Sequence, residues 1–347
     1  MMESWTAKAL LAGYQCVLAW IGYDRLWRVP VQNGSLLAIG RVAKTGRFAN
    51  GSPLIRRYTG VAALDRRLAT AVVFYTDLVD PSNDSAERNR LLLVQVHSTM
   101  QATAFCMLAA TRRGPSLPAV QLLIPAAWGM INQFWGAAFV YPLYLAIDSG
   151  SALLPLNQDA VPALLLSACI GALIPLALLY PAYAPSCSAE LRQRSIALYR
   201  LAPIAFVVMH LGLEQITPAF FRATSVPPAA PYLAAGLLAA AAHVYSVSAA
   251  LVRGGRKLLA LVFWPEGPSA KRPAAMVPDA AHLFLWYDLA VIAPSFFVRA
   301  YTILLPVAAP LLGVEPLALA LLLFAATVVL GPAPVLCFAY AARTTIY

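Results

Sequence analysis

The sequence predicts an all-α, polytopic membrane helix bundle with about eight transmembrane helices and both termini in the cytosol. The first observation is composition, since 61% of the 347 residues are hydrophobic and only 12% are charged, against roughly 25% charged residues in a soluble domain. The second is that apolar stretches of about 20 residues, enough to cross the hydrocarbon core, recur along the chain. The third is an uneven distribution of basic residues between the two sides of these stretches.

Eight apolar segments predict the transmembrane helices. They lie at 61–80, 91–111, 119–147, 160–183, 196–217, 231–251, 281–305 and 316–341. The third segment is too long for an upright helix, so we expect it to tilt or to kink near Pro125 or Pro142. The connection 252–280 mixes glycine, proline and basic residues, a composition compatible with a short amphipathic helix along the interface.

The chain is predicted to have two regions. Residues 1–57 form a cytosolic or interfacial N-terminal region with a short apolar anchor, and residues 58–347 form the eight-helix transmembrane domain. The apolar stretch "ALLAGYQCVLAW" (9–20) is too short to span a membrane and lacks the cleavage pattern of a signal peptide. We expect it to lie at the interface or to dock on the bundle.

The basic residues set the predicted orientation. Most of the 25 Lys and Arg fall in the N-terminal region, in the even-numbered connections and near the C-terminus, whereas Arg88, Arg90 and Arg222 fall on the other side. An excess of Lys and Arg marks the cytosolic side of a membrane protein. The net charge of +10 is therefore attributed to membrane topology, and no nucleic-acid partner is predicted.

Ionisable side chains inside the predicted helices are the main candidates for chemistry, because they are costly in lipid and face a partner or a cavity. The stretch "HLFLWYDLAVIAPSFFVRAY" (282–301) contains Asp288 and Arg299 on one helix face, too far apart along the axis to pair. Counting depth along the helices places His210 and Glu214 in the layer of Arg299. We therefore expect an ion pair between Glu214 and Arg299.

The layer nearer the cytosol contains Asp65, Asp288 and His243. A glutamate beside an arginine stays ionised, whereas an aspartate desolvated among aromatic residues without a cation can stay protonated near neutral pH. Asp288 is therefore predicted to be the better proton donor. The alternative is structural: Asp288 bonds a helix end or a tyrosine, and Glu214 and Arg299 form a stabilising clamp.

Aromatic and amide side chains form a second set of candidates. The third segment contains "WGMINQFWGAAFVYPLY" (128–144), and aromatic faces stabilise cations. The predicted substrate-binding residues are Trp128, Asn132, Gln133, Phe134, Trp135, His243, Trp286 and Tyr287. The alternative interpretation is core packing and an interfacial aromatic belt.

Several catalytic motifs are absent from the sequence. It contains no DDxxD-like, NSE-like or NDxxD acidic cluster for magnesium diphosphate, and no HExxH, P-loop or GxSxG motif. The five cysteines are scattered without a CxxC pair. We therefore predict no metal and no cofactor, which leaves proton-initiated chemistry open.

A resemblance to a known family is carried by three segments: "YTGVAALDRRL" (58–68), "INQFWGAAFVYPLYLAID" (131–148) and "HLFLWYDLAV" (282–291). They resemble the integral-membrane terpene cyclases of fungal meroterpenoid pathways, typified by the ascochlorin and ascofuranone cyclases, and related membrane proteins of indole-diterpene clusters. The resemblance covers most of the chain from about residue 58. One departure is Asp148, where the family pattern leads us to expect a histidine.

The resemblance implies metal-independent, proton-initiated cyclisation of a prenyl chain, with or without an epoxide, on an aromatic or polyketide head group. Asp288 is the expected acid, and Glu214 is the second candidate for the acid or the terminal base, positioned by His210 and Arg299; Asp65 is a further catalytic candidate. The expected membrane is the endoplasmic reticulum, and the expected partners are a lipophilic prenylated substrate, membrane lipid, and the epoxidase and prenyltransferase of a pathway. A small-molecule transporter and a non-catalytic membrane scaffold remain as alternatives.

Overall fold

The computed structural model describes residues 5–48, 51–113, 121, 123–148, 154–220, 226–265, 267–268 and 276–346. Across these residues the regular elements are helical, and the only extended pairing is two isolated bridges, Arg47–Pro53 and Arg113–Leu156. The predicted all-α class is confirmed. The helices are α1 (Trp5–Tyr23), the π-helical η1 (Asp24–Arg28), α2 (Val29–Gln32), α3 (Ser35–Thr45), α4 (Ala62–Thr76), α5 (Ala86–Ala110), α6 (Leu123–Trp135), α7 (Ala137–Ile147), the 3-10 turn η4 (Gln158–Ala160), α8 (Val161–Gly171), α9 (Leu176–Tyr183), α10 (Ala189–Tyr199), α11 (Ala202–Phe220), α12 (Ala230–Phe263), α13 (Met276–Leu312), α14 (Pro316–Leu330) and α15 (Pro332–Ile346).

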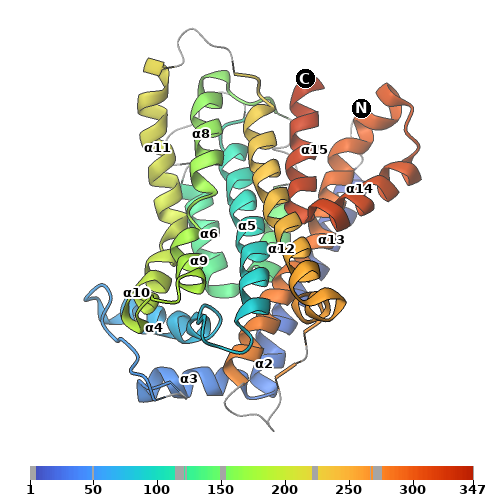
Figure 1. Cartoon of the computed structure of the whole chain (residues 1–347). Helices are drawn as coiled ribbons and strands as arrows, with labels where there is room; N and C mark the ends of the chain where they lie inside the picture. Colours follow the sequence, from blue (N-terminus) through green and yellow to red (C-terminus); the bar gives the residue numbers. More distant parts are fainter. Residues whose placement is uncertain are drawn as a thin grey trace.

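Long apolar helices form the centre of the molecule. In the described part of the chain, five are long and apolar enough to cross a membrane: Ala86–Ala110, Gln158–Tyr183, Ala202–Phe220, Ala230–Phe263 and Met276–Ala308. They run side by side through the bundle (Figure 1). The chain is therefore a polytopic membrane protein, while the predicted number of eight spans is not confirmed.

The first predicted span, 61–80, is the 15-residue helix α4. It carries Asp65, Arg66 and Arg67 and lies across the lower end of the bundle, next to α3 (Figure 1). Fifteen residues cover only about 22 Å, less than the hydrocarbon core. Its length, charge and direction set α4 apart from the five long helices.

The third predicted span, 119–147, is a helical hairpin rather than one tilted helix. The break is at Gly136, which has φ 84° and ψ 152°, and not at either proline. Pro125 lies in the first turn of α6, where proline is tolerated, and Pro142 lies inside α7 without ending it. The backbone conformation of Gly136 is almost restricted to glycine. The kink predicted at Pro125 or Pro142 was wrong, because the break uses glycine's conformational freedom.

A second hairpin has the same construction. The predicted span 316–341 is divided into α14 and α15 at Gly331, with φ 96° and ψ 165°. This turn lies beside His243, in the middle of α12, and α15 then returns to stack Tyr340 on Tyr232 at the start of α12. Both hairpins therefore enter the bundle to about half its depth and return to the end they came from.

The hairpins change the predicted topology. Arg88 and Arg90 lie at the start of α5, where Arg88 pairs with Asp279 at the start of α13 and Arg90 contacts Glu87, the partner of Arg253. They therefore belong to the basic end rather than the opposite one. Both chain termini lie at the other end of the bundle (Figure 1). The prediction that the termini and most basic residues share the cytosolic side is therefore not confirmed. Arg222 lies outside the described residues.

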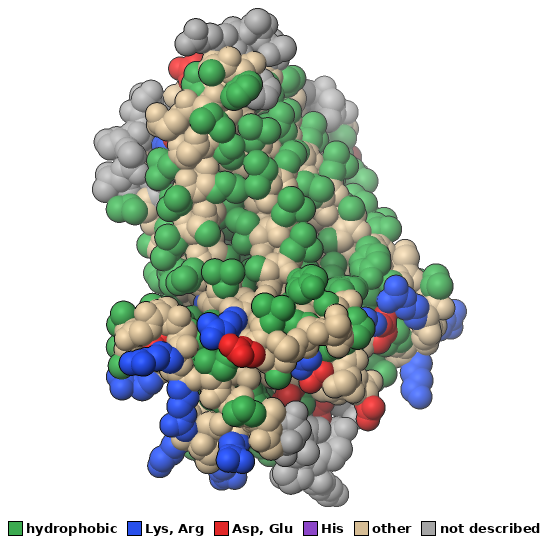
Figure 2. All heavy atoms as spheres, turned by 60° about the vertical axis from the view of Figure 1, so that its left-hand side comes forward, with side chains coloured by type: hydrophobic (Ala, Val, Ile, Leu, Met, Phe, Trp, Pro, Cys, Tyr) green, Lys and Arg blue, Asp and Glu red, His purple; other side chains and the backbone are tan. Residues whose placement is uncertain are grey.

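The molecular surface has one apolar and one charged zone. Figure 2 shows hydrophobic side chains covering the upper part of the bundle, with Lys, Arg, Asp and Glu gathered at its lower end. Near that end, Gly255 (φ 60°, ψ −154°) kinks α12, so that the chain from Arg256 to Phe263 forms a separate short helix. A helix was expected within 252–280, and residues 266 and 269–275 of that connection lie outside the described residues.

The N-terminal helix docks on the bundle. Gln15 is fully buried and exchanges hydrogen bonds with Ser295 of α13, at 3.1 Å to its carbonyl oxygen and 2.6 Å from its hydroxyl. Gly22 approaches the backbone of Ala138 so closely that a Cβ atom there would collide with it. Of the two expectations for the stretch 9–20, docking is the one that the structure shows.

Candidate active site

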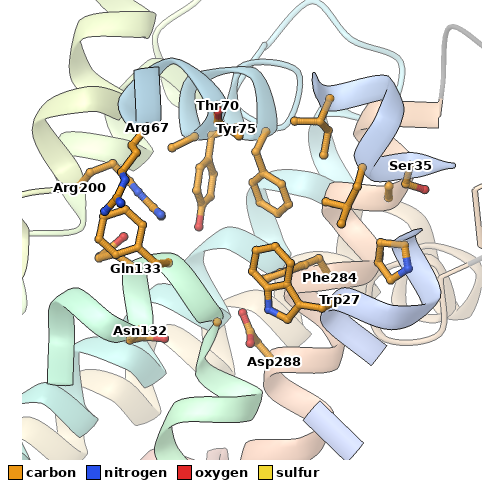
Figure 3. A pocket seen from close by; sticks show the side chains of 18 of the residues that line it. Trp27, Ser35, Arg67, Thr70, Tyr75, Asn132, Gln133, Arg200, Phe284 and Asp288 are labelled. Carbon is orange, nitrogen blue, oxygen red and sulfur yellow. The ribbon is translucent and has the colours of Figure 1, made fainter. Parts of the chain in front are cut away.

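A cavity of about 290 Å³ lies where the turn between α6 and α7 meets α13, α4 and the N-terminal helices. Most of its wall is apolar and aromatic, and the polar groups are few (Figure 3). Its lining residues are Trp27, Pro30, Ser35, Leu36, Ile39, Arg67, Thr70, Ala71, Phe74, Tyr75, Met100, Asn132, Gln133, Phe134, Gly136, Tyr199, Arg200, Ala280, Phe284 and Asp288. Such a wall with few polar groups is typical of a site for a lipophilic molecule.

Asp288 is the carboxyl group of this cavity. It projects from α13 and is 1% exposed, and its Oδ1 accepts a hydrogen bond of 2.7 Å from the backbone N–H of Ala138. The break at Gly136 makes this contact available, because α7 starts anew there with unpaired N–H groups. In the described part of the chain, no cationic side chain lies within 4 Å of Asp288.

Arg299 holds the other end of α7. Its Nη2 donates a hydrogen bond of 2.6 Å to the carbonyl oxygen of Asp148, the C-terminal cap of α7, and lies 3.6 Å from Oδ2 of the same residue. An acceptor oxygen at a helix N-terminus and a cationic donor at its C-terminus both satisfy unpaired backbone groups of the helix. Asp288 and Arg299 are thus spaced along α13 to match the length of α7.

Aromatic rings form one wall of the cavity. The ring of Phe284 meets those of Trp27 and Phe74 edge to face, with centroids 6.3 and 5.2 Å apart, and Phe74 meets Tyr75 at 4.9 Å. These rings come from η1, α4 and α13 and surround the space above Asp288 (Figure 3). Their faces can stabilise positive charge that develops in the cavity.

Glu214 lies in a different cluster, so the predicted ion pair with Arg299 was wrong. Both oxygens of Glu214 accept hydrogen bonds from Arg112, at 2.6 and 2.7 Å, and Oε1 lies 3.1 Å from Nε2 of His210. His210 in turn contacts the hydroxyl of Ser167 at 2.8 Å. Counting depth along the helices failed because Arg299 pairs instead with Asp148, at the end of the half-length helix α7. None of these residues lines the cavity of Asp288.

Asp65 organises the chain before α4. Its carboxylate accepts hydrogen bonds from the backbone N–H groups of Tyr58, Thr59 and Gly60, at 3.1, 2.7 and 3.1 Å, and from the Thr59 hydroxyl at 2.8 Å. The bond from the Thr59 backbone is the main cause that lowers the pKa of Asp65. Asp65 is therefore held as an anion by its own loop, and it does not line the cavity.

The predicted substrate-binding residues are divided by the structure. Asn132, Gln133 and Phe134 line the cavity. The others lie elsewhere: Trp128 packs on Tyr144, Trp135 on Trp27, Trp286 donates to the Phe263 carbonyl, Tyr287 lies beneath Arg25, and His243 bonds Gln95 and Val328. Those five were selected by residue type and depth, and the helix faces they occupy point to other partners.

Sequence reasoning missed the contribution of the N-terminal region and of two arginines. Trp27, Ser35 and Ile39 complete the cavity, although residues 1–57 were predicted to form a region separate from the transmembrane domain. Arg67 and Arg200 also line it. The sequence signal for Arg67 was a charged residue in an apparently apolar helix. Arg67 was not among the ionisable residues whose depths were compared.

These features define a polytopic helical membrane protein whose interior holds an aromatic cavity with one buried carboxyl group. The chain belongs to the CtvD-domain family, whose model matches residues 13–346. It is 39% identical to "Terpene cyclase alnG" of Emericella nidulans, covering 98% of this chain and 95% of the relative. It is 31% identical to "Terpene cyclase DEP1" of Alternaria brassicicola, covering 83% of this chain and 84% of the relative.

A further relative is "Terpene cyclase DEP1" of Fusarium langsethiae, 28% identical over 94% of this chain and 96% of the relative. No solved structure matches the chain. The resemblance to fungal membrane terpene cyclases that the sequence predicted is confirmed, and an enzyme is favoured over the transporter and scaffold alternatives.

Proposed function

We propose that this protein is a membrane-bound terpene cyclase that converts a linear prenyl chain, on an aromatic or polyketide head group, into a ring isomer. The observation that carries the proposal is the buried carboxyl group of Asp288, facing an aromatic cavity without a cationic partner among the described residues. The names of the relatives support the reaction class. The cavity supplies the apolar surroundings in which a prenyl chain can fold.

The proposed reaction begins with proton transfer from Asp288 to an epoxide oxygen or a terminal alkene of the substrate. The electron pair of a neighbouring double bond then forms the new carbon–carbon bond, and the positive charge moves along the chain. The rings of Trp27, Phe74 and Phe284 stabilise that charge. Loss of a proton from the final cation restores a double bond, and that proton regenerates the acid form of Asp288, so the product is an isomer of the substrate.

Asp288 is favoured over Glu214 because of their partners. Glu214 is bound by both nitrogens of a guanidinium fork and by His210. A carboxylate in such a bidentate pair is stabilised as the anion and is a poor proton donor. Glu214 also lies away from the cavity that contains the aromatic wall. It is therefore proposed to stabilise the bundle through Arg112.

The reaction is proposed to need no metal or other cofactor. The substrate is a lipophilic prenylated molecule that enters from membrane lipid, and an epoxidase and a prenyltransferase are the classes of enzyme that would prepare it. The endoplasmic reticulum is the proposed membrane, with the basic end of the bundle in the cytosol because an excess of Lys and Arg marks that side.

The test is to incubate membranes containing the protein with a farnesylated aromatic substrate and with its terminal epoxide, in the presence of EDTA. The expected result is a product of unchanged mass and altered chromatographic mobility. Failure of well-folded protein to form an isomer across several head groups would contradict the proposed activity. An isomer that disappears with EDTA and returns with added metal would contradict the metal-independent mechanism.

The residue assignment is tested with Asp288→Asn. The asparagine Oδ1 can still accept the bond from Ala138, so the start of α7 is kept, while the acidic proton is lost. We expect turnover to fall by about 10²- to 10⁴-fold with unchanged folding. Glu214→Gln, away from the cavity, is the matched control and should retain turnover per folded molecule; full turnover in Asp288→Asn would refute the role of Asp288.

A further inference from the structure

Two arginines face the candidate active site. Arg67 comes from α4, and Arg200 follows α10 directly, so segments far apart in sequence bring both side chains to the same cavity. In Figure 3 they lie together at one side of the pocket, away from Asp288 and the ring of Phe284. The cavity thus has a cationic side and a separate acidic, aromatic side.

Several arginines elsewhere in the bundle have carboxylate partners, and the buried Arg113 donates to the hydroxyl of Tyr232. Arg112 pairs with Glu214, Arg192 with Asp80 and Arg299 with Asp148. Within the described residues, by contrast, no carboxylate lies within 4 Å of Arg67 or Arg200, and neither side chain donates a hydrogen bond. A guanidinium group with its donors directed at a cavity is placed to receive an anion from outside the chain.

The surroundings hold both groups in position. The Arg67 guanidinium carbon lies 5.3 Å from the ring centroid of Phe134, a cation–π distance. Arg200 lies beside the hydroxyl-bearing rings of Tyr75 and Tyr199, which line the same cavity. Burial lowers the pKa of Arg200, but the guanidinium group remains protonated because its ordinary pKa is so high. A bound oxyanion would offset that desolvation.

We propose that Arg67 and Arg200 form a binding site for an oxyanion on the head group of the substrate. The inference rests on the proposed function and adds to it the class of substrate, a prenylated aromatic or polyketide acid whose carboxylate is held at the guanidinium groups. The apolar chain then extends past the aromatic wall towards Asp288. Holding the charged end fixes the position of the reacting end, which raises its effective concentration at the acid.

The test measures binding rather than turnover. The probes are a resorcylic acid with a saturated chain of farnesyl length and its methyl ester, neither of which can cyclise, and equilibrium dialysis against purified protein in detergent gives both affinities. The wild type should bind the acid about tenfold or more tightly than the ester. Equal affinity for the two probes would overturn the proposal.

Variants locate the effect. Arg67→Gln and Arg200→Gln should reduce the preference for the acid to about twofold or less, with ester binding unchanged, because only the charge-assisted bonds are lost. Arg200→Lys, which keeps the charge, should retain part of the preference and controls for misfolding. Arg66→Gln is the matched control, because Arg66 is an exposed arginine of α4 like Arg67 but does not line the cavity. A preference for the acid that persists in both glutamine variants would overturn the assignment.

Two further outcomes are distinguishable. A short-chain phosphatidic acid is the probe for a lipid head group: if it binds at these arginines while acid and ester bind equally, the site takes lipid phosphate and the proposal is overturned. If the preference for the acid is found and lost as expected but no substrate is cyclised, the oxyanion site stands and the proposed function fails.

Discussion

The two helical hairpins have the same backbone but are held differently. Each is broken at a glycine in nearly the same conformation, Gly136 and Gly331. The helix after Gly331 begins with Pro332, which has no N–H to satisfy, and its turn packs on the ring of His243. The helix after Gly136 begins with two alanines. The carboxyl group of Asp288 accepts a hydrogen bond from the N–H of the second, Ala138.

This difference shows that a half-length helix can start inside the bundle without a buried carboxyl group. Proline at the first position satisfies the same structural need in α15. A carboxyl cap is therefore not a general requirement of such a hairpin, and Asp288 also lines the cavity, which agrees with the role proposed for it.

The largest effect is expected at the C-terminal end of α7. Arg299→Met removes the cation that binds Asp148 and leaves that carboxylate buried, which should lower the free energy of unfolding by about 3–5 kcal/mol. Thermal unfolding in detergent measures this loss of stability. Combining the change with Asp148→Asn should recover part of the loss, and strictly additive losses would show that the two side chains do not interact.

The next effect concerns the two glycines. Gly136→Ala and Gly331→Ala both force alanine into a conformation that costs about 1–3 kcal/mol. Gly136→Ala should cost more, because its Cβ would collide with Leu26 and touch the Phe284 ring, whereas at Gly331 the nearest atoms are those of His243 at 3.1 Å. Unfolding of both variants in one detergent gives the order, and a larger loss for Gly331→Ala would contradict this account.

A smaller effect separates capping from chemistry at Asp288. Asp288→Ala loses the bond to Ala138 and should lower the unfolding free energy by about 1 kcal/mol, whereas Asp288→Asn keeps an acceptor and should change it by less. Both should lose turnover. If only the alanine variant is inactive, the carboxyl group acts through the fold of α7 and not as an acid.

The smallest effect lies outside both hairpins, at Asp77 after α4. Burial raises the pKa of Asp77 to about 6, helped by the neighbouring charge of Asp80. The folded state therefore holds this proton more tightly than the unfolded state, so stability is highest at low pH and is lost as pH rises through about 6. Asp77→Asn should raise the free energy of unfolding at pH 8 by about 1 kcal/mol or less, because solvent screens this half-buried carboxylate, and leave it unchanged below pH 4. Thermal unfolding at the two pH values measures the difference.

The class of the fold could be predicted from composition and apolar segments alone, because lipid restricts a spanning chain to few structures. The two hairpins could not be predicted in this way. The sequence around Gly136 is "WGAA", and nothing local to it shows that the chain reverses there. A glycine that breaks a helix and one that packs a helix have the same neighbours in sequence, and only tertiary contacts separate them.

The same limit governed the site. Asp288 was identified because a carboxyl group in an apolar helix is rare and needs a reason. The structural alternative, that Asp288 bonds a helix end, is what the structure shows at Ala138. Which helix end it bonds could not be predicted, because a backbone N–H has no signature in the sequence. Depth counting assumed that each apolar segment crosses once, so it placed Glu214 beside Arg299 when the end of α7 occupies that position.

The docking of α1 has a consequence for the order in which the molecule is completed. Gln15 meets Ser295, 280 residues further along the chain, and ribosomes add roughly 5–20 residues each second, so α1 waits roughly 15–55 s for its partner during synthesis. Trp27 and Ile39 remain without the cavity they line until α13 has been inserted. The cavity is therefore completed late, and a chain released early contains most of the helices but lacks part of the cavity wall.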